Sequence, residues 1–355
     1  MKCDECEKCK ALGYKFCNKC GADLSDNEDD SQEPVVVEKS SELESLLKKS
    51  VIPAMFLVFI TLVIDVALIL VYIGPTLEWV ADYSTSLYIY FIDFFKFATL
   101  EGTAIQLYMI ILAIILMFCV GIILYKSKDA LLVNKPYYVE RIRETPLYWL
   151  SMVFGSTLVL ELIIVLLMNA LGVSTPTPSP LIDLTPEKAL FLFSEAAVYE
   201  EVTFRVILFG VPMAVIALIC GRKDFYRYLV GGFGASKIAM VFLVISTILF
   251  AYAHVGGWGA WKMIPVMLGG FAMGFLFMKY GLYAAIIFHM ANDFMAVWLP
   301  TIPELGSILE ILIILMGILC LPILFKSTWQ GLKGIKDLPL GFEKNQEESN
   351  DSNLD

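Results

Sequence analysis

Long apolar blocks separated by short polar segments occupy the chain from Val51 to Phe325. Each block has about 20 residues or more, which is the length that an α-helix needs to cross ~30 Å of hydrocarbon. The sequence therefore predicts an all-α polytopic membrane protein with about eight transmembrane helices. The expected spans are residues 51–73, 105–125, 147–171, 187–220, 238–256, 260–279, 281–299 and 306–325.

Two stretches depart from the simple pattern of spans. Residues 80–100 are aromatic and mildly charged, and we expect an interfacial or re-entrant helix there, with a ninth span as the alternative. The fourth block is longer than a span requires, so residues 184–198 are expected to begin as an interfacial helix. Thr185-Pro186-Glu187 is typical of the N-terminal cap of such a helix.

The composition agrees with these blocks. Apolar residue types make up 58% of the 355 residues and charged ones 17%, against ~45–50% and ~25% in average soluble domains. The net charge of −10 excludes a nucleic-acid binder driven by positive charge. Residues 23–44 and 343–355 carry much of that charge and have the composition of solvated, largely disordered segments.

Lysine and arginine concentrate in alternate loops, which sets the expected orientation. The positive-inside rule then places both termini in the cytoplasm of a multi-pass protein of the cell membrane. An even number of spans agrees with this arrangement. The residues that carry the bias are Lys48, Lys49, Lys126, Lys128, Lys135, Arg141, Arg143, Arg222, Lys223, Arg227, Lys237, Lys279, Lys326, Lys333 and Lys336.

Five of the eight cysteines lie in the first twenty residues. Cys17-Asn-Lys-Cys20-Gly is typical of a zinc knuckle, and its mate is either Cys6 with Cys9 or Cys3 with Cys6. Four thiolates close a tetrahedral site, and the metal supplies folding energy to a segment too small for its own core. We expect a structural zinc; a redox pair or a set of disulfides is the alternative.

This cysteine segment resembles the short zinc-ribbon domains that precede many prokaryotic membrane proteins, and a protein partner of the ribbon is implied. The fifth cysteine leaves the ligand set open. The expected domains are a zinc ribbon at 1–24, an acidic flexible linker at 25–47, a transmembrane helical domain at 48–338 and an acidic disordered tail at 339–355.

Ionisable side chains inside the apolar blocks are few, and each is a functional candidate because it is costly in hydrocarbon unless it faces protein or water. Six of them fall into three tight groups, and the other four are expected to face the bundle or a helix end. The full set is Asp65, Glu161, Glu195, Glu200, Glu201, Arg205, His254, His289, Asp293 and Glu310.

The first group is Tyr199-Glu200-Glu201-Val-Thr-Phe-Arg205. Glu201 and Arg205 are four residues apart, so they share one helix face and can pair. Glu200 is rotated by ~100° from Glu201 and is left without that partner. An uncompensated carboxylate suits a general base. A purely structural Glu201–Arg205 ion pair is compatible with catalysis nearby.

The other two groups are Phe250-Ala-Tyr-Ala-His254 and His289-Met-Ala-Asn292-Asp293, and they hold both histidines of the chain. If the bundle brings the three groups together, a water between Glu200 and one histidine could attack a carbonyl carbon. The other histidine with an amide or acid could then bind the oxyanion. The same residues could instead hold a divalent metal, and each histidine alone could be a helix–helix hydrogen bond.

The ordered motifs Glu-Glu-x-x-x-Arg, Phe-x-x-x-His and His-x-x-x-Asn/Asp resemble the signature of the CPBP intramembrane proteases. That family includes type II CAAX prenyl endopeptidases and bacteriocin-immunity proteins. The resemblance covers residues 146–298. It implies an endopeptidase that hydrolyses a membrane-anchored peptide, with a prenylated CAAX C-terminus as the best-known substrate type. Its partners would be this peptide and the lipid bilayer, with no nucleic acid.

The resemblance also implies a role for each residue. Glu200 is the general base, His254 positions the water, and His289 with Asp293 lines the oxyanion side. Glu201 and Arg205 support and orient the site. The expected reaction uses no catalytic metal, with a metal-dependent one as the alternative.

The last motif position is Asp293, where many members of the family have asparagine. An ionised aspartate cannot donate to an oxyanion. Asp293 would then be protonated, or orient His289, or leave the donor role to Asn292.

Two readings without proteolysis stay open. One is a catalytically silent scaffold or immunity-type protein whose zinc ribbon recruits a partner. The other is a transporter with an acidic site at the membrane midplane, which should show broken helices and internal repeats. Neither of these features is visible in the sequence.

Overall fold

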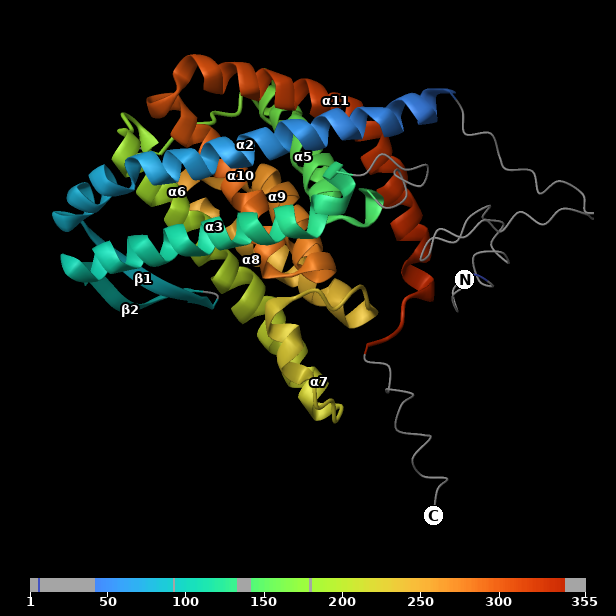
Figure 1. Ribbon diagram of the computed structural model, residues 1–355. Coiled ribbons are helices and arrows are strands. Elements are labelled where there is room, and N and C mark those ends of the chain that lie inside the picture. The colour runs from blue at the N-terminus through green and yellow to red at the C-terminus, as the bar shows by residue number, and fades with distance from the viewer. Residues whose placement is uncertain (1–5, 7–41, 92, 133–141, 179–180, 342–355) are drawn as a thin grey trace, which may run out of the picture.

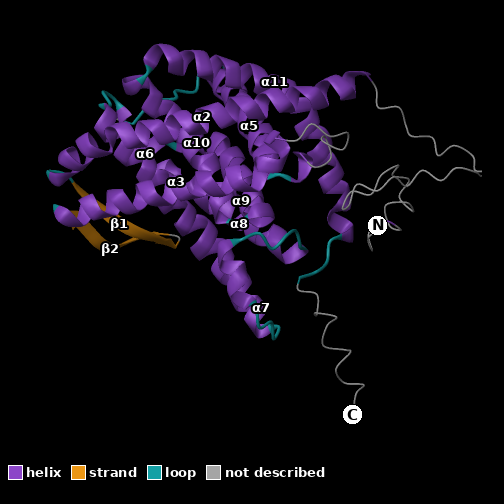
Figure 2. Cartoon of the chain, viewed as in Figure 1, coloured by secondary structure: helices purple, strands orange, loops and turns teal. Residues whose placement is uncertain are grey.

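The computed structural model describes Cys6 and residues 42–91, 93–132, 142–178 and 181–341. Eight helices in this part of the chain are long and apolar enough to cross a membrane. They pack side by side as one bundle, and helix dominates the structure (Figures 1 and 2). The predicted multi-pass membrane protein with eight spans is confirmed.

Each span coincides with a predicted block: the first, second and eighth spans extend beyond their blocks by up to nine residues, and the ends of the other spans agree within three residues. The fourth span is a stack of three helical segments. The spans are α2 (Glu42–Ala81), α3 (Thr103–Leu132), α5 (Pro146–Ala170), α6 (Pro186–Glu201) with η2 (Val202–Gly210) and α7 (Val211–Ile219), α8 (Lys237–Trp258), α9 (Met263–Tyr280), α10 (Leu282–Thr301) and α11 (Pro303–Gly334). Short 3-10 turns are η3 (Phe225–Val230), η4 (Ala260–Lys262) and η5 (Ile335–Asp337).

The structure describes only small parts of the polar segments at the two ends of the chain. The predicted zinc ribbon lies outside the described residues apart from Cys6, which is buried. Residues 42–47, predicted as the end of the linker, belong to α2. At the other end, the carbonyl oxygens of Pro339 and Leu340 accept hydrogen bonds from the first amides of α8. The rest of the predicted tail lies outside the described residues.

Helix starts follow the capping residues in the sequence. The Thr185 hydroxyl accepts a hydrogen bond from the amide of Lys188 at 3.4 Å, which confirms the predicted cap of α6. Thr145 caps α5 and Ser236 caps α8 in the same way. Each hydroxyl satisfies an amide that has no partner within its helix.

The helix expected at residues 80–100 is wrong, because this segment forms an antiparallel hairpin. Strand β1 (Ser84–Phe91) pairs with β2 (Asp93–Glu101), with Ser84 opposite Glu101. The β1 sequence STSLYIYF is rich in aromatic, β-branched and hydroxyl residues, which favour strand over helix. Figure 1 shows the hairpin folding back beside α3 after α2 ends.

The fourth span also departs from the regular helix that its length predicted. Directly after Glu201, η2 is a π-helix, in which amides bond to carbonyls five residues back. Such wide turns are rare and often occur at functional sites. Here the wide turns carry Arg205 and follow the two adjacent glutamates without interrupting the span.

Helix α10 is the most buried of the eight spans. It lies between α6, α9 and α11, which places His289 inside the bundle. Two small residues allow α5 and α11 to approach closely, since a Cβ at Gly155 would lie 3.0 Å from the Cα of Gly317. Asp65 of α2 is fully buried and accepts a hydrogen bond from the Trp298 indole of α10 at 2.8 Å.

Candidate functional site

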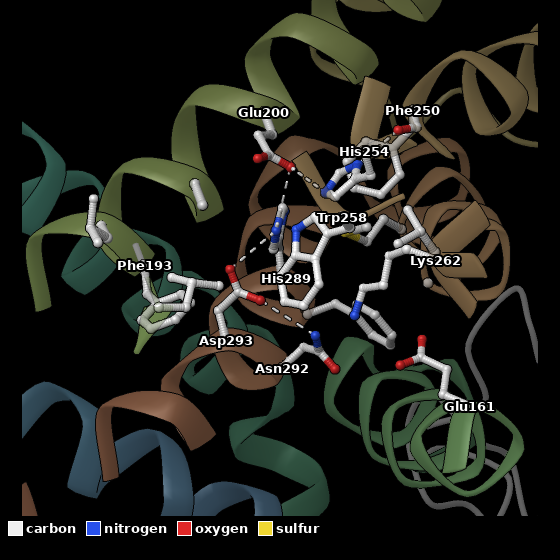
Figure 3. A pocket seen from close by; sticks show the side chains of 17 residues that line it. Glu161, Phe193, Glu200, Phe250, His254, Trp258, Lys262, His289, Asn292 and Asp293 are labelled. Carbon is white, nitrogen blue, oxygen red and sulfur yellow. Dashed lines mark hydrogen bonds and ion pairs between the residues drawn. The ribbon is translucent and has the colours of Figure 1, made fainter. Parts of the chain in front are cut away.

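Three helices bring Glu200, His254 and His289 to one place. Glu200 lies at the end of α6, His254 near the end of α8, and His289 in the middle of α10. Glu200 Oε2 lies 3.7 Å from His254 Nε2 and 3.9 Å from His289 Nε2. Figure 3 shows the three side chains pointing toward one another. The convergence that the sequence motifs required is therefore present.

The separations between these atoms suit a bridging water. Direct hydrogen bonds between nitrogen and oxygen are 2.7–3.2 Å long, and both distances from Glu200 exceed that range. A single water can bridge polar groups at such a spacing. Glu200 Oε2 is buried and has no direct hydrogen-bond partner among the described residues. The carboxylate is thus positioned to accept a proton from a small molecule between it and the histidines.

The ring of His254 is oriented by its own helix. His254 Nδ1 lies 2.9 Å from the carbonyl oxygen of Phe250, one turn earlier. A carbonyl oxygen can only accept, so Nδ1 carries the proton and donates. The Nε2 atom that faces Glu200 is then an acceptor in the neutral ring. His254 can therefore accept one hydrogen of a water whose other hydrogen points to Glu200.

The ring of His289 is held by carboxylates on both sides. Its Nδ1 lies 3.0 Å from Glu201 Oε1, and its Nε2 lies 3.4 Å from Asp293 Oδ2. Both partners are acceptors when ionised, so this geometry matches an imidazolium that donates from each nitrogen. The side chain is almost fully buried. His289 can thus present a positive charge to the site.

Glu201 and Arg205 form the predicted pair on one face of the helix. Both side chains are fully buried, and Arg205 Nε lies 3.2 Å from Glu201 Oε2. The guanidinium also donates to the Ser246 hydroxyl of α8 at 3.2 Å and to the Gly270 carbonyl oxygen of α9 at 3.3 Å. Arg205 therefore fixes Glu201 against two other helices, and Glu201 in turn orients His289.

Asp293 and Asn292 lie side by side at the edge of the site. The Asn292 amide Nδ2 is 3.4 Å from Asp293 Oδ1, and the other Asp293 oxygen contacts the His289 ring at Nε2. The Nδ1 atom of His289 is held by Glu201 instead. Asp293 thus contacts the same ring nitrogen of His289 that faces Glu200, and Asn292 supplies an amide donor beside it.

The side chains of Glu200, His254, His289, Asn292 and Asp293 line a cavity of about 270 Å³, which we call the catalytic cavity. Among the wall residues that the motif analysis did not single out for the site are Glu161 of α5, Trp258 of α8 and Lys262 of η4. Lys262 Nζ lies 4.3 Å from the centre of the Trp258 ring (Figure 3). Glu161 was visible as an ionisable residue in an apolar block, but its place opposite α9 depends on helix packing.

The remaining acids of the apolar blocks lie elsewhere. Asp65 binds Trp298, and Glu195 accepts a hydrogen bond from Thr85 of the hairpin. Glu310 of α11 is absent from the wall of the catalytic cavity. The expectation that these acids face the bundle or a helix end fits the first two contacts.

The donor types at the site are those that a zinc ion binds, since Glu200 offers oxygen and the histidines offer nitrogen. As the side chains are placed, however, no group of three or more His, Cys, Asp or Glu in the described part of the chain could hold a metal ion. We therefore derive no step through a catalytic metal.

The fold and the site define a multi-pass membrane protein with a buried polar centre between its helices. Residues 186–295 match the family model described as type II CAAX prenyl endopeptidase Rce1-like. This range runs from α6 to α10 and holds all three motifs. The match covers less than half of the chain and agrees, for this part, with the family resemblance that the three motifs carry. Comparisons with curated proteins and with solved structures found no match.

Proposed function

We propose that the protein is an intramembrane endopeptidase that hydrolyses a peptide bond of a membrane-anchored substrate with a water activated by Glu200. The observation that carries this proposal is the spacing of the three polar groups. Glu200 Oε2 lies 3.7 Å and 3.9 Å from the Nε2 atoms of two histidines on other helices, and all three line one cavity. The family match over residues 186–295 supports the same reaction class.

In the proposed reaction the water first donates one hydrogen bond to Glu200 and another to His254. Glu200 takes the first proton as the water oxygen bonds to the substrate carbonyl carbon. The carbonyl oxygen becomes an oxyanion, which the positive charge of the His289 imidazolium and the Asn292 amide stabilise. Glu200 then returns its proton to the amide nitrogen as the C–N bond breaks. The products are a carboxylic acid and an amine, and Glu200 is restored.

The supporting residues hold these groups before the substrate arrives. Arg205 and Glu201 fix the ring of His289, and the Phe250 carbonyl fixes the ring of His254. Preorganised donors stabilise a developing charge without having to reorient during the reaction. The substrate we propose is a lipid-anchored peptide of the prenylated CAAX type, in line with the family match.

The orientation and the zinc ribbon complete the proposal. Figure 1 shows the start of α2 and the end of α11 at the same end of the bundle, as an even number of crossings requires. We place that end in the cytoplasm on the strength of the lysine and arginine bias. The cysteines among the first twenty residues would there bind a structural zinc and recruit a protein partner.

The test is cleavage by the purified full-length protein in liposomes. The probes are a peptide ending in an S-farnesyl CAAX sequence and a plain transmembrane peptide, and mass spectrometry identifies the products. We expect cleavage by the wild type, loss of cleavage in Glu200→Gln and in His289→Ala, and normal cleavage in Glu310→Gln. Cleavage that persists in Glu200→Gln would contradict the mechanism. Wild-type protein that cleaves neither probe would favour the non-catalytic scaffold.

A further inference from the structure

A cavity of about 490 Å³ lies in the segment that joins α7 to α8. All the residues of its wall belong to residues 222–233, and among the described residues it shares none with the catalytic cavity. We call it the loop cavity. Its polar wall consists of Arg222, Asp224, Tyr226, Arg227 and Tyr228. Two guanidinium groups thus face a space that the proposed reaction does not use.

The segment around the loop cavity carries more positive than negative charge. Residues 220–236 contain three basic side chains, Arg222, Lys223 and Arg227, and one acid, Asp224, which gives a net charge of +2. Asp224 accepts two hydrogen bonds of 2.9 Å from Arg222. Arg227 Nη1 lies 3.8 Å from Asp224 Oδ2, beyond hydrogen-bond distance, and the Arg227 side chain is 73% exposed. One carboxylate does not balance three cations, so a bound anion would compensate the remaining charge.

The backbone of this segment is held against two helices. The Gly232 amide donates to the Phe277 carbonyl oxygen of α9 at 2.8 Å. On the other side, the Leu229 carbonyl oxygen lies so close to Gly210 of η2 that a Cβ there would meet it at 2.5 Å. The arginines and tyrosines of the wall are therefore presented by a backbone that is already fixed in place, which lowers the entropy cost of binding a ligand.

The same contacts place the loop cavity level with a belt of interfacial side chains. Phe277, which accepts the loop hydrogen bond, belongs to the last turn of α9. At this end of the bundle Lys279 Nζ lies 5.0 Å from the centre of the Trp149 ring, and Lys126 Nζ lies 4.8 Å from that of Tyr283. Tryptophan, tyrosine and lysine side chains concentrate where membrane-spanning helices leave the hydrocarbon. The cavity therefore lies at the level of the lipid headgroups.

The chemistry of the wall selects a phosphate that is joined to apolar chains. Guanidinium groups match phosphate oxygens in geometry and donate paired hydrogen bonds to them. The exposed Tyr226 hydroxyl is a further donor at the cavity. Beside these polar groups, Val230 of the wall and Ile219 at the end of α7 leave apolar surface exposed. A lipid satisfies both parts of this surface, whereas a soluble phosphate would leave the apolar part uncovered.

We propose that the loop cavity binds the phosphate group of an anionic phospholipid, in the leaflet on the side of the chain termini. Arg222 and Arg227 donate to the phosphate oxygens, and the acyl chains lie along the apolar surface of Ile219 and Val230. The lysine and arginine bias places this leaflet on the cytoplasmic side, where anionic lipids are attracted to basic clusters next to a span. The site is independent of the proposed peptide hydrolysis.

The first test is native mass spectrometry of the full-length protein in neutral detergent, titrated with phosphatidylglycerol or with phosphatidylcholine of the same acyl chains. We expect the wild type to prefer phosphatidylglycerol. The double variant Arg222→Gln with Arg227→Gln should bind it about tenfold more weakly, as expected for lost charge-assisted hydrogen bonds. Lys128→Gln, an exposed lysine at the same end of the bundle, is the matched control and should bind it as the wild type does. Equal binding of the two lipids by the wild type, or unchanged binding in the double variant, overturns the proposal.

Two further measurements keep the test decisive. Arg227→Gln alone changes an exposed side chain and leaves the Arg222–Asp224 pair in place, so it should fold normally and bind phosphatidylglycerol about threefold more weakly, half of the tenfold effect in free energy. Unchanged binding in this variant counts against the site. Inorganic phosphate at the same concentration as the lipid should leave phosphatidylglycerol bound. Displacement of the lipid by inorganic phosphate would show a site for a soluble anion and overturn the assignment to a phospholipid.

Discussion

Replacing Arg205 by methionine removes the positive charge that holds Glu201 inside the bundle. The two side chains are fully buried and 3.2 Å apart. The guanidinium also binds the Ser246 hydroxyl and the Gly270 carbonyl oxygen, so it links η2 to α8 and α9. The substitution leaves a buried carboxylate whose other contact is the ring of His289. We therefore expect a loss of stability together with a loss of order at the histidine.

The size of the effect follows from these contacts. Removing one partner of a buried ion pair costs about 3–5 kcal/mol, because the remaining charge is left uncompensated. The hydrogen bonds to Ser246 and Gly270 are worth about 1 kcal/mol each, and a protonated His289 offsets part of the loss. We expect Arg205→Met to lower the free energy of unfolding by about 3–5 kcal/mol. The double variant with Glu201→Gln should lose less, since no buried carboxylate remains.

The assay is unfolding in mixed detergent micelles with increasing SDS, followed by tryptophan fluorescence. Arg227→Met is the matched control, because Arg227 is 73% exposed and lies 3.8 Å from Asp224. An exposed pair of this kind contributes at most about 1 kcal/mol. The reasoning fails if Arg205→Met is within about 1 kcal/mol of the wild type. It also fails if the double variant is no more stable than Arg205→Met alone.

Three further predictions concern other parts of the molecule. Trp298→Phe leaves Asp65 without its indole donor and should cost about 1–2 kcal/mol in the same SDS assay; an unchanged midpoint would contradict this. Gly317→Ala places a methyl group against the backbone of Gly155 and should cost about 1–3 kcal/mol, so wild-type stability would show that α5 and α11 do not pack as described. If the N-terminal cysteines bind zinc as proposed, Cys20→Ser should abolish the zinc measured by mass spectrometry, while cleavage in liposomes persists. Cleavage by this variant that stops on chelation and returns with added zinc would instead indicate a catalytic metal.

Much of the fold follows from the sequence because the bilayer imposes a simple length rule. The eight apolar blocks match the eight spans of the structure. The site could also be predicted from the sequence, since charge is so scarce in these blocks that Glu200, His254 and His289 stand out. The four-residue spacings of Glu201 with Arg205 and of His289 with Asp293 correctly predicted which side chains share a face. The spans and the site residues could therefore be predicted mostly from local spacing along the chain.

The parts that were missed depend on tertiary contacts. The segment at residues 80–100 is apolar and aromatic, which suits a helix or a strand, and its contacts with α6 accompany the hairpin that forms there. The π-helix at Val202–Gly210 has no signature in its sequence VTFRVILFG, which a regular α-helical span would also accommodate. Trp258 and Lys262 join the catalytic cavity because α8 ends there and η4 turns back toward the site.

The most direct test of the central claim is the ratio of kcat/KM between the wild type and Glu200→Gln for an S-farnesyl CAAX peptide in liposomes. Glutamine keeps the size of the side chain but cannot accept the proton of the water. General-base catalysis contributes about 10²–10⁴-fold, so we expect a loss of at least ~100-fold in Glu200→Gln, with Glu310→Gln within about twofold of the wild type. A Glu200→Gln enzyme that keeps more than about a tenth of the wild-type kcat/KM would contradict the role assigned to this carboxylate.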